Sequence, residues 1–394
     1  MKKLLVFCLI VFYISFWGCK KENKIHQLFI ETNNEISNQK TDIKVYTKLN
    51  QKTFSGNIKT RGGSSINFPK KSYEINLNNE TELAGLPSDD DWILNANFID
   101  KTFLRHVISY ELFQDMNNHN IVSKTKYVEL FINNSYEGLY VLMEKLDKST
   151  LQIDSQDSLG FIFKEPHIFR RNYSNIIPQK KNNFHQQTFP KIYNSNKHNF
   201  IENIRSFIIN SNDSVFVKNI EKVFNLNNIV DWHLLLLITN NSDGILKNFY
   251  LYKISQNDPV RISPWDYDHS FGRDGDNELN LNTRKVDLNR SILFKRLLEF
   301  DWYKSKLKNR WIYLNNKHIL SVTGIKSRIS KKNKELQDAI IKNHSKWPIN
   351  HPAYYDNNNL HDEIKIMYDF IDKKHFELDD YFKNMTATQN HQKL

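Results

Sequence analysis

The spacing of apolar residues changes between the first and second parts of this chain of 394 residues. From about residue 41 to residue 148, short runs follow one another in which every second residue is apolar: IKVYTKL, FSGNIKTR, SYEINL, KYVELFI and GLYVLMEK. A period of two places alternate side chains on one face, which is typical of β-strands. The segment INNSYEGLY has a turn signal and predicts that the last two runs form a hairpin. The first part is therefore predicted to consist mainly of strands.

Helical spacing dominates the second part. One helix is already expected within the strands, at residues 101–116, where apolar residues recur three and four positions apart. After residue 200 the helical segments are NFIENIRSFI, SVFVKNIEKVFN, NIVDWHLLLLITN and the stretches 291–346 and 360–383, interrupted by the strand-like pieces NFYLYKI and PVRIS. We therefore predict a two-lobed α+β fold. Its β-rich N-lobe with one helix spans 41–148, and its mainly helical C-lobe with the hairpin spans 149–388.

The N-terminus predicts export from the cell. Two lysines precede an apolar run from Leu4 to Trp17, which is shorter than the roughly 20 residues of a membrane-spanning helix. Residues 1–18 are therefore predicted to be a signal peptide. Gly18-Cys19 resembles the lipidation point of bacterial lipoproteins, so we expect residues 19–40 to be a lipid-anchored tether, with simple secretion as the alternative. Cleavage there leaves no thiol besides Cys19, which excludes a disulfide scaffold and a zinc site with cysteine ligands.

Positive charge is concentrated in one segment. The formal net charge is +11, and seven basic residues but only one acidic residue, Glu165, lie between Lys164 and Asn199. Such a segment is either a solvated insertion or a surface that meets an anionic partner. Because an exported protein rarely meets nucleic acid, no nucleic-acid partner is expected.

Acidic and amide residues flank the hairpin predicted in the second part. Asp243 and Asn248 precede its first strand, and Asp266 and Asp268 follow its second strand. The ends of a hairpin lie side by side, so these four side chains are expected to converge. Continued strand geometry would also place Asp266 and Asp268 on one face. Carboxylate and amide oxygens suit Mg²⁺ or Mn²⁺ and the phosphates that these ions carry.

Residues that suit a nucleotide phosphate occur in the first part. In FPKKSYEINL, Lys71 shares the parity of the apolar residues and is expected to face inward, whereas Lys70 is expected to face water. An inward lysine needs an anionic partner, which a phosphate or Glu111 on the following helix can supply. The preceding KTRGGSS combines Arg61, two glycines and the hydroxyl of Ser65 in a turn whose backbone N–H groups can lie over phosphates.

The order of these features along the chain is that of a protein kinase. There, a catalytic Asp and an Asn precede a hairpin, and a metal-binding Asp followed by Gly comes after it. Gly272 follows Asp266 at a greater distance than in the D-F-G motif, so an ordinary kinase is not expected. The chain instead resembles the spore coat protein H (CotH) kinase family from about residue 43 to 272. The blocks that carry this resemblance are IKTRGGSSINFPKKSYEINL, WILNANFIDKTFLRHVISYEL, VELFINNSYEGLYVLMEKLDK, NNSDGILKNFYLYK and ISPWDYDHSFG.

The resemblance implies an atypical, secreted or spore-coat protein kinase with a reduced kinase-like fold. Such an enzyme transfers phosphate from ATP, with Mg²⁺ or Mn²⁺, to Ser or Thr of a protein substrate. It implies a catalytic role for Asp243 and metal-ligand roles for Asn248 and Asp266, with Asp268 as an additional ligand. It also implies that Lys71 and Arg61 face the phosphates. With the turn and helix described above, the expected ATP-facing residues are Arg61, Ser65, Lys71 and Glu111.

Export takes the protein to a compartment where ATP is scarce, and this leaves alternatives open. One is a non-catalytic surface lipoprotein on the same fold, which would not bind nucleotide. Another moves AMP rather than phosphate onto a protein, and the mass of the adduct would reveal it. A third is a metal-dependent glycosyl or phosphodiester enzyme built on Asp266 and Asp268, in which replacing Lys71 would have little effect.

Overall fold

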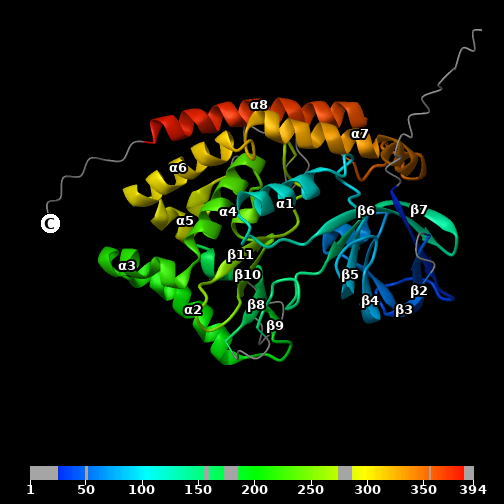
Figure 1. The fold of residues 1–394 in the computed structure, drawn as a ribbon, viewed down its shortest axis with the longest axis horizontal. Helices are drawn as coiled ribbons and strands as arrows, with labels where there is room; N and C mark the ends of the chain where they lie inside the picture. The colour runs from blue at the N-terminus through cyan, green and yellow to red at the C-terminus, as the bar shows by residue number, and fades with distance from the viewer. Residues whose placement is uncertain are drawn as a thin grey trace, which may run out of the picture.

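The structure is a computed structural model that describes residues 25–48, 52–154, 159–172, 185–273, 286–354 and 356–385. The signal peptide and the lipidated Cys19 that the sequence predicts lie outside these residues. In Figure 1 the first strands gather on one side, and most of the helices lie on the other.

The strands of the first part close into a barrel in the order β1-β2-β3-β4-β5-β7-β6. Their bounds are β1 (His26–Glu31), β2 (Thr41–Thr47), β3 (Phe54–Arg61), β4 (Ser72–Thr81), β5 (Asp89–Asn95), β6 (Thr125–Ile132) and β7 (Ser135–Glu144). Strand β1 closes the barrel by pairing in parallel with β6, while the other neighbours are antiparallel. Apolar side chains from each strand, such as Leu28, Ile75 and Leu130, fill the interior.

Strand β1 corrects one expectation. It lies inside the range 19–40, for which the sequence predicted a tether, so the fold begins earlier along the chain. Leu28 and Ile30 alternate with more exposed neighbours and are fully buried in the barrel. This short alternation is enough to place β1 in the barrel, because the neighbouring strands enclose the rest of the core.

The second part consists of a small sheet and the helices packed around it. The sheet has the order β11-β10-β8-β9. Its strands are β8 (Phe161–Lys164), β9 (Gln186–Phe189), β10 (Phe249–Lys253) and β11 (Arg261–Pro264). The helices are α1 (Arg105–Met116), α2 (Ser195–Asn210), α3 (Asp213–Val223), α4 (Leu226–Thr239), α5 (Ile292–Leu297), α6 (Asp301–Asn316), α7 (Val322–Lys346) and α8 (Leu360–Asn384). Figure 1 shows α7 and α8 side by side along the top, above α1 and α4.

The predicted mixed α+β class, with a β-rich first part and a helical second part, is confirmed. Helix α1 leaves the barrel and joins the core of the second part, where its apolar side chains pack with those of α4 and the small sheet. Within the described ranges, no helix combines the length and the apolar character needed to cross a membrane.

A buried cluster of charges joins three distant segments. It contains three cations and three anions: Lys101, Arg105, Arg273, Asp100, Asp356 and Glu363. The guanidinium group of Arg105 contacts Asp100 at 2.7 Å and Glu363 at 2.9 Å. Arg273 pairs with Glu363 and, at 2.8 Å, with Asp356. The cluster thereby fastens the start of α1 and the segment after β11 to the first turn of α8.

Replacing Glu363 with Gln is expected to destabilise the protein strongly. The change leaves Arg105 and Arg273 buried with too little negative charge, and breaking a buried ion pair in this way costs about 3–5 kcal/mol. Chemical denaturation measures the loss. Asp369→Asn, on an exposed position of the same helix, is the matched control and should stay within about 0.5 kcal/mol of the unmodified protein.

The same variant should weaken the dependence of stability on acid. Burial alone would raise the pKa of Glu363, but the charges of Arg105 and Arg273 outweigh it and hold the pKa below its ordinary value of 4.5. This stabilisation is complete above that value and is lost as the pH falls through the lowered pKa. An equal loss of stability in both variants, or an unchanged acid dependence in Glu363→Gln, would contradict the assignment.

Candidate functional site

The start of β10 and the end of β11 bring two of the predicted site residues together. The backbone N–H of Trp265 donates to the carbonyl oxygen of Asn248 (2.9 Å), and the Asn248 side-chain amide donates to the carbonyl oxygen of Asp266 (2.9 Å). Asn248 and Asp266 both have left-handed backbones, with φ of 60° and 58°. The predicted meeting of hairpin ends is therefore confirmed for these two residues.

Asp243 follows α4 on a short 3-10 turn, Asp243–Ile245. Its carboxylate is partly exposed and forms an ion pair with Lys247 at 2.8 Å. The turn packs against the segment after β11, because a Cβ on Gly244 would lie 3.0 Å from the hydroxyl of Tyr267. The turn that carries Asp243 therefore contacts Tyr267, the residue between Asp266 and Asp268. In the described part of the chain, no hydrogen bond joins the three carboxylates.

Asp268 is mostly covered, whereas Asp266 is exposed. The left-handed backbone of Asp266 ends the strand geometry at Pro264, so the expected alternation does not determine where these two side chains point. Burial, and then the charge of Asp266, raise the pKa of Asp268 to about 6. The negative charge of Asp266 thus adds to burial in disfavouring a charged Asp268, and a bound cation would oppose both effects.

The donor set fits a hard divalent cation that is shared with a ligand. Asn248 retains its side-chain oxygen, and Asp266 and Asp268 offer carboxylate oxygens. Among the residues that the structure describes, no group of three or more His, Cys, Asp or Glu side chains is arranged to hold a metal ion. Mg²⁺ is often bound by one or two carboxylates together with phosphate oxygens and water, so two carboxylates and an amide suffice for it.

The barrel contributes a positive charge to this region. Arg61, at the end of β3, places its guanidinium group 5.7 Å from the ring centre of Trp265. Trp265 in turn packs edge-on against Tyr250 of β10. Beyond Arg61, Gly62 has a φ of 133°, and a Cβ there would lie 2.3 Å from the hydroxyl oxygen of Ser65. Glycine therefore allows the turn to close over Ser65.

The structure corrects the expectation for Lys70. This residue is 1% exposed, rather than facing water, and donates to the carbonyl oxygens of Ala96 (2.9 Å) and Leu139 and to the side-chain oxygen of Asn343 (3.0 Å). It precedes β4, which begins at Ser72, so the parity of the strand does not extend to it. Because Asn343 belongs to α7, Lys70 fastens that helix to the barrel.

Lys71 is half-buried and holds the turn before β4. Its ammonium group donates to the carbonyl oxygens of Ile66 (2.8 Å) and Phe68 (2.7 Å). The suggested pair with Glu111 is wrong, since the described residues contain no contact between the two. Glu111 forms an ion pair with Lys332 of α7 at 2.7 Å, because α1 turns this side chain toward α7.

Helix α1 holds the backbone that carries Asp266 and Asp268. The N–H of Asp266 donates to the hydroxyl oxygen of Tyr110 (3.2 Å), the N–H of Tyr267 donates to Nδ1 of His106 (3.3 Å), and Arg105 donates to the carbonyl oxygen of Ser270 (3.0 Å). Burial lowers the pKa of His106 to about 4, against the opposing charges of Asp266 and Asp100. The ring is therefore neutral, as an acceptor at Nδ1 requires.

Two further charged residues form ion pairs or hydrogen bonds with the hairpin or the barrel and were not predicted as site residues. Glu165, after β8, accepts a hydrogen bond from the backbone N–H of Asn248 (3.3 Å). Lys145, after β7, pairs with Glu74 (3.5 Å) and Asp91 (3.2 Å) on the barrel. Glu165 is the single acidic residue of the basic segment 164–199, and nothing in the sequence indicates its partner. The hydrogen bond with Asn248 forms because β8 lies beside β10.

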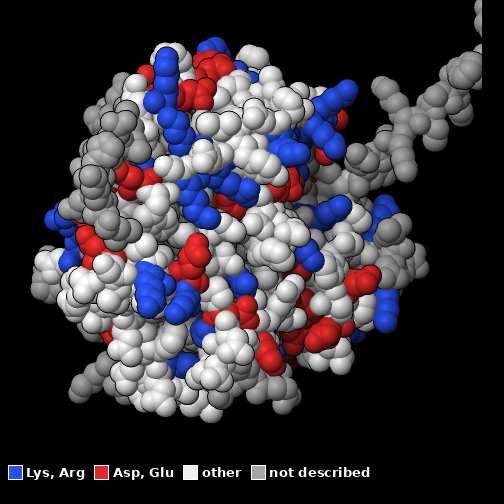
Figure 2. Space-filling model, turned by 60° about the vertical axis from the view of Figure 1, so that its left-hand side comes forward, with Lys and Arg blue, Asp and Glu red and all other residues white. Residues whose placement is uncertain are grey.

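The basic segment 164–199 is only partly described, since residues 173–184 lie outside the described ranges. Lys197 is buried, and the side chain of Arg205 bonds to the carbonyl oxygens of Ile168 and Arg170. Figure 2 shows a face of the molecule on which basic and acidic side chains are interspersed. That face therefore has no broad field of one sign.

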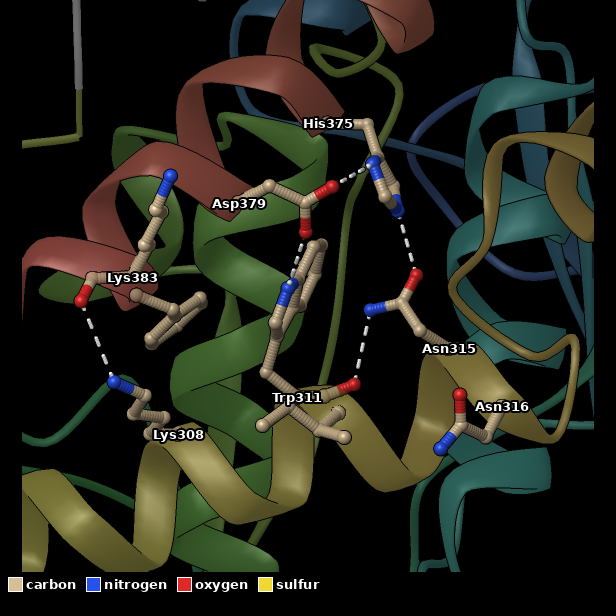
Figure 3. A pocket seen from close by; sticks show the side chains of 9 residues that line it. Lys308, Trp311, Asn315, Asn316, His375, Asp379 and Lys383 are labelled. Carbon is tan, nitrogen blue, oxygen red and sulfur yellow. Dashed lines mark hydrogen bonds and ion pairs between the residues drawn. The ribbon is translucent and has the colours of Figure 1, made fainter.

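A pocket of about 360 Å³ lies between α6 and α8, away from the hairpin (Figures 1 and 3). Its polar groups bond to one another: Trp311 donates to Asp379 (2.8 Å), and His375 contacts both Asp379 (3.1 Å) and Asn315 (2.5 Å). None of the predicted site residues lines it, so we do not assign it to the candidate site.

Replacing Gly244 with Ala is expected to disturb the site through packing. The added Cβ would lie 2.6 Å from a methyl carbon of Leu236 and 3.0 Å from the Tyr267 hydroxyl, and such overpacking costs about 1–3 kcal/mol. Thermal or chemical denaturation measures this loss of stability. In the double variant Gly244→Ala/Leu236→Ala the space is restored, so the loss should be smaller than the sum of the single losses. Simple additivity would show that the turn does not pack as described.

Comparison with known proteins supports a kinase family. The family model described as CotH kinase protein matches residues 58–378, which extends the similarity beyond the hairpin into the last helices. The inner spore coat protein H of Bacillus subtilis (strain 168) is 23% identical over 257 residues, covering 64% of this chain and 69% of that protein. The crystal structure of the Helicobacter pylori proinflammatory kinase CtkA is 12% identical and covers 83% of this chain and 94% of its own, with a TM-score of 0.34. The family model covers the barrel from the second half of β3 onward, the hairpin and most of the helices, and from it we conclude that this chain belongs to the CotH kinase family.

Proposed function

We propose that the protein is an atypical protein kinase that transfers the γ-phosphate of ATP to a Ser or Thr hydroxyl of a protein substrate, with Mg²⁺ or Mn²⁺. The observation that carries the proposal is the meeting of Asn248 and Asp266 at one end of the small sheet, beside Arg61 from the barrel. Membership of the CotH kinase family supports the same chemistry. In this proposal the barrel and the helical part act as the two lobes of a reduced kinase-like fold.

The oxygens of Asn248, Asp266 and Asp268 would hold the divalent cation. When bound, ATP and the ion supply the phosphoryl group and the positive charge that stabilises its oxygens during transfer. Burial is the largest cause of the raised pKa of Asp268, and the charges of Asp266 and Asp100 add to it. The site therefore gains from binding a cation.

Asp243 would orient the substrate hydroxyl and accept its proton. The carboxylate is partly exposed, and its ion pair with Lys247 fixes its direction. The turn that carries it packs against Tyr267, so its distance from Asp266 is set by the core. Phosphoryl transfer depends mainly on positioning and charge, so this arrangement can act without further covalent chemistry.

Arg61, Ser65 and Lys71 would face the phosphates from the barrel. An ammonium group has three donors, and Lys71 uses two of them on the carbonyl oxygens of Ile66 and Phe68. The third donor remains for a phosphate oxygen, so Lys71 would both stabilise the turn and bind the ligand. Glu111 has no place in this proposal, because its partner is Lys332.

We also propose that the protein acts after export, anchored through a lipid on Cys19, with a protein and not a nucleic acid as its partner. The support is the N-terminal sequence, with its apolar run and Gly18-Cys19. The Bacillus subtilis relative is a protein of the inner spore coat, which supports a place in a coat or at a surface.

Phosphotransfer by the purified chain from residue 20 onward tests the central proposal. We expect label from γ-labelled ATP to appear on an acceptor protein in the presence of Mn²⁺ or Mg²⁺. Asp243→Asn should reduce the rate by about 100- to 10,000-fold, the contribution typical of a general base. Asp266→Asn should reduce it by weakening the cation site. Asp369→Asn, an exposed carboxylate of α8, is the control and should retain the rate.

The position of the label separates the alternatives. Label transferred from α-labelled ATP would show AMP transfer in place of phosphate transfer. Nucleotide binding without transfer of either label would show a binding protein on the same fold. Absence of nucleotide binding at millimolar ATP and Mn²⁺, by a folded protein, would refute the nucleotide-dependent proposals together.

Replacing each of the two adjacent lysines should mainly affect a different property of the protein. Lys71→Ala should lower kcat/KM for ATP by about 10- to 100-fold, the value of one charge-assisted hydrogen bond, and should lower the melting temperature less than Lys70→Ala, because its acceptors lie in a half-buried turn. Lys70→Ala should lower the melting temperature, because it removes a buried ammonium donor from the carbonyl oxygens of Ala96 and Leu139. Steady-state kinetics and thermal denaturation check the pair, and equal effects on ATP use would contradict the assigned roles.

A further inference from the structure

Three residues with left-handed backbones lie at one end of the small sheet. They are Glu165 (φ 49°), Asn248 (φ 60°) and Asp266 (φ 58°). Glu165 follows β8, Asn248 precedes β10 and Asp266 follows β11; β10 lies between the other two strands and runs antiparallel to both. Each of the three has a side chain with oxygen acceptors.

This backbone conformation is uncommon for residues other than glycine. Asn and Asp adopt it more readily than other side chains, whereas Glu has no such advantage. Strained residues of this kind persist where the surrounding structure holds them, and they cluster at functional sites. Two of the three already belong to the proposed cation site, so the third needs an explanation.

Hydrogen bonds connect the three residues in a chain. The carboxylate of Glu165 accepts from the backbone N–H of Asn248 (3.3 Å), and the N–H of Glu165 donates to the carbonyl oxygen of Phe249 (3.0 Å). The side-chain amide of Asn248 then donates to the carbonyl oxygen of Asp266 (2.9 Å). Since Asn248 is 7% exposed, its N–H depends on a protein acceptor.

The charges of Glu165 and Asp243 both act on Arg170. Burial lowers the pKa of Arg170, and the charges of Glu165 and Asp243 both oppose this effect. Arg170 therefore lies within electrostatic reach of both carboxylates. Glu165 therefore contacts Asn248 directly and shares Arg170 as a neighbouring charge with Asp243.

We propose that Glu165 is a positioning residue of the cation site. Its carboxylate holds the backbone of Asn248 in the left-handed conformation, and the side chain of Asn248 then holds Asp266. This role rests on the proposed function, because it presupposes that Asn248 and Asp266 bind a divalent cation with a nucleotide. It acts through hydrogen-bond geometry, so the length of the side chain matters more than its charge.

Three substitutions separate geometry from charge. Glu165→Gln keeps the length and an acceptor oxygen but removes the charge. Glu165→Asp keeps the charge but is one methylene shorter, and Glu165→Ala removes both features. Glu221→Ala, at an exposed position of α3, is the matched control for loss of a carboxylate.

The test measures binding of Mn²⁺ to the purified chain from residue 20 onward, by electron paramagnetic resonance, with a non-hydrolysable ATP analogue present. Residues that position metal ligands typically contribute 10- to 100-fold to metal affinity. We therefore expect Glu165→Ala and Glu165→Asp to weaken Mn²⁺ binding by about 10-fold or more, whereas Glu165→Gln and Glu221→Ala stay within about threefold of the unmodified protein. The rate of phosphotransfer at saturating Mn²⁺ should fall less than the affinity.

Other outcomes overturn the inference. Weak binding by Glu165→Gln with near-normal binding by Glu165→Asp would show that the charge acts, and not the geometry. Unchanged binding in all Glu165 variants would show that Glu165 has no role at the site. If Glu165→Ala fails to fold by circular dichroism, the Gln and Asp variants still decide between these results. Absence of Mn²⁺ binding by the unmodified protein would instead refute the proposed function itself, and with it the premise of this inference.

Discussion

The buried ionic cluster around Arg105 is the constraint on which the rest of the second part depends. Charges removed from water are retained only when they are paired, and here Arg105 and Arg273 share Glu363, while Asp100 and Asp356 complete the balance. The partners come from the start of α1, the segment after β11 and the beginning of α8. No one of these segments can shift without leaving a buried charge unpaired, so the backbone after the hairpin has one favoured position.

Helix α1 transmits this constraint to the candidate site. Arg105 bonds to Ser270, and His106 and Tyr110 accept the N–H groups of Tyr267 and Asp266; the first two of these contacts are buried, and the contact of Asp266 is partly buried. A site that must hold a cation and phosphate oxygens within a few tenths of an ångström gains from such fixed backbone. Of the side chains proposed to meet the ligand, Asp243 and Asp266 are the more exposed, whereas Asn248 is buried with the groups that orient them.

The sequence predicted those features that depend on neighbours along the chain. Strand β3 has the predicted limits, and the juxtaposition of Asn248 and Asp266 follows from a hairpin alone. Closure of the barrel was not predicted, because the parallel pairing of β1 with β6 joins segments about a hundred residues apart and has no local signal. For the same reason the sequence did not indicate the role of Glu165, whose partner lies across the sheet. The prediction for Lys70 was wrong because the alternation of the strand was extended to a residue that precedes β4.

The central claim is that the end of the small sheet, where Asn248 and Asp266 meet beside Arg61, binds a divalent cation together with a nucleotide. Anomalous scattering from crystals grown with Mn²⁺ and a non-hydrolysable ATP analogue tests it most directly. A manganese peak in contact with the side chains of Asp266 and Asn248, with phosphate density toward Arg61, is the predicted result. A nucleotide bound elsewhere, or a manganese peak remote from Asp266, would contradict the account.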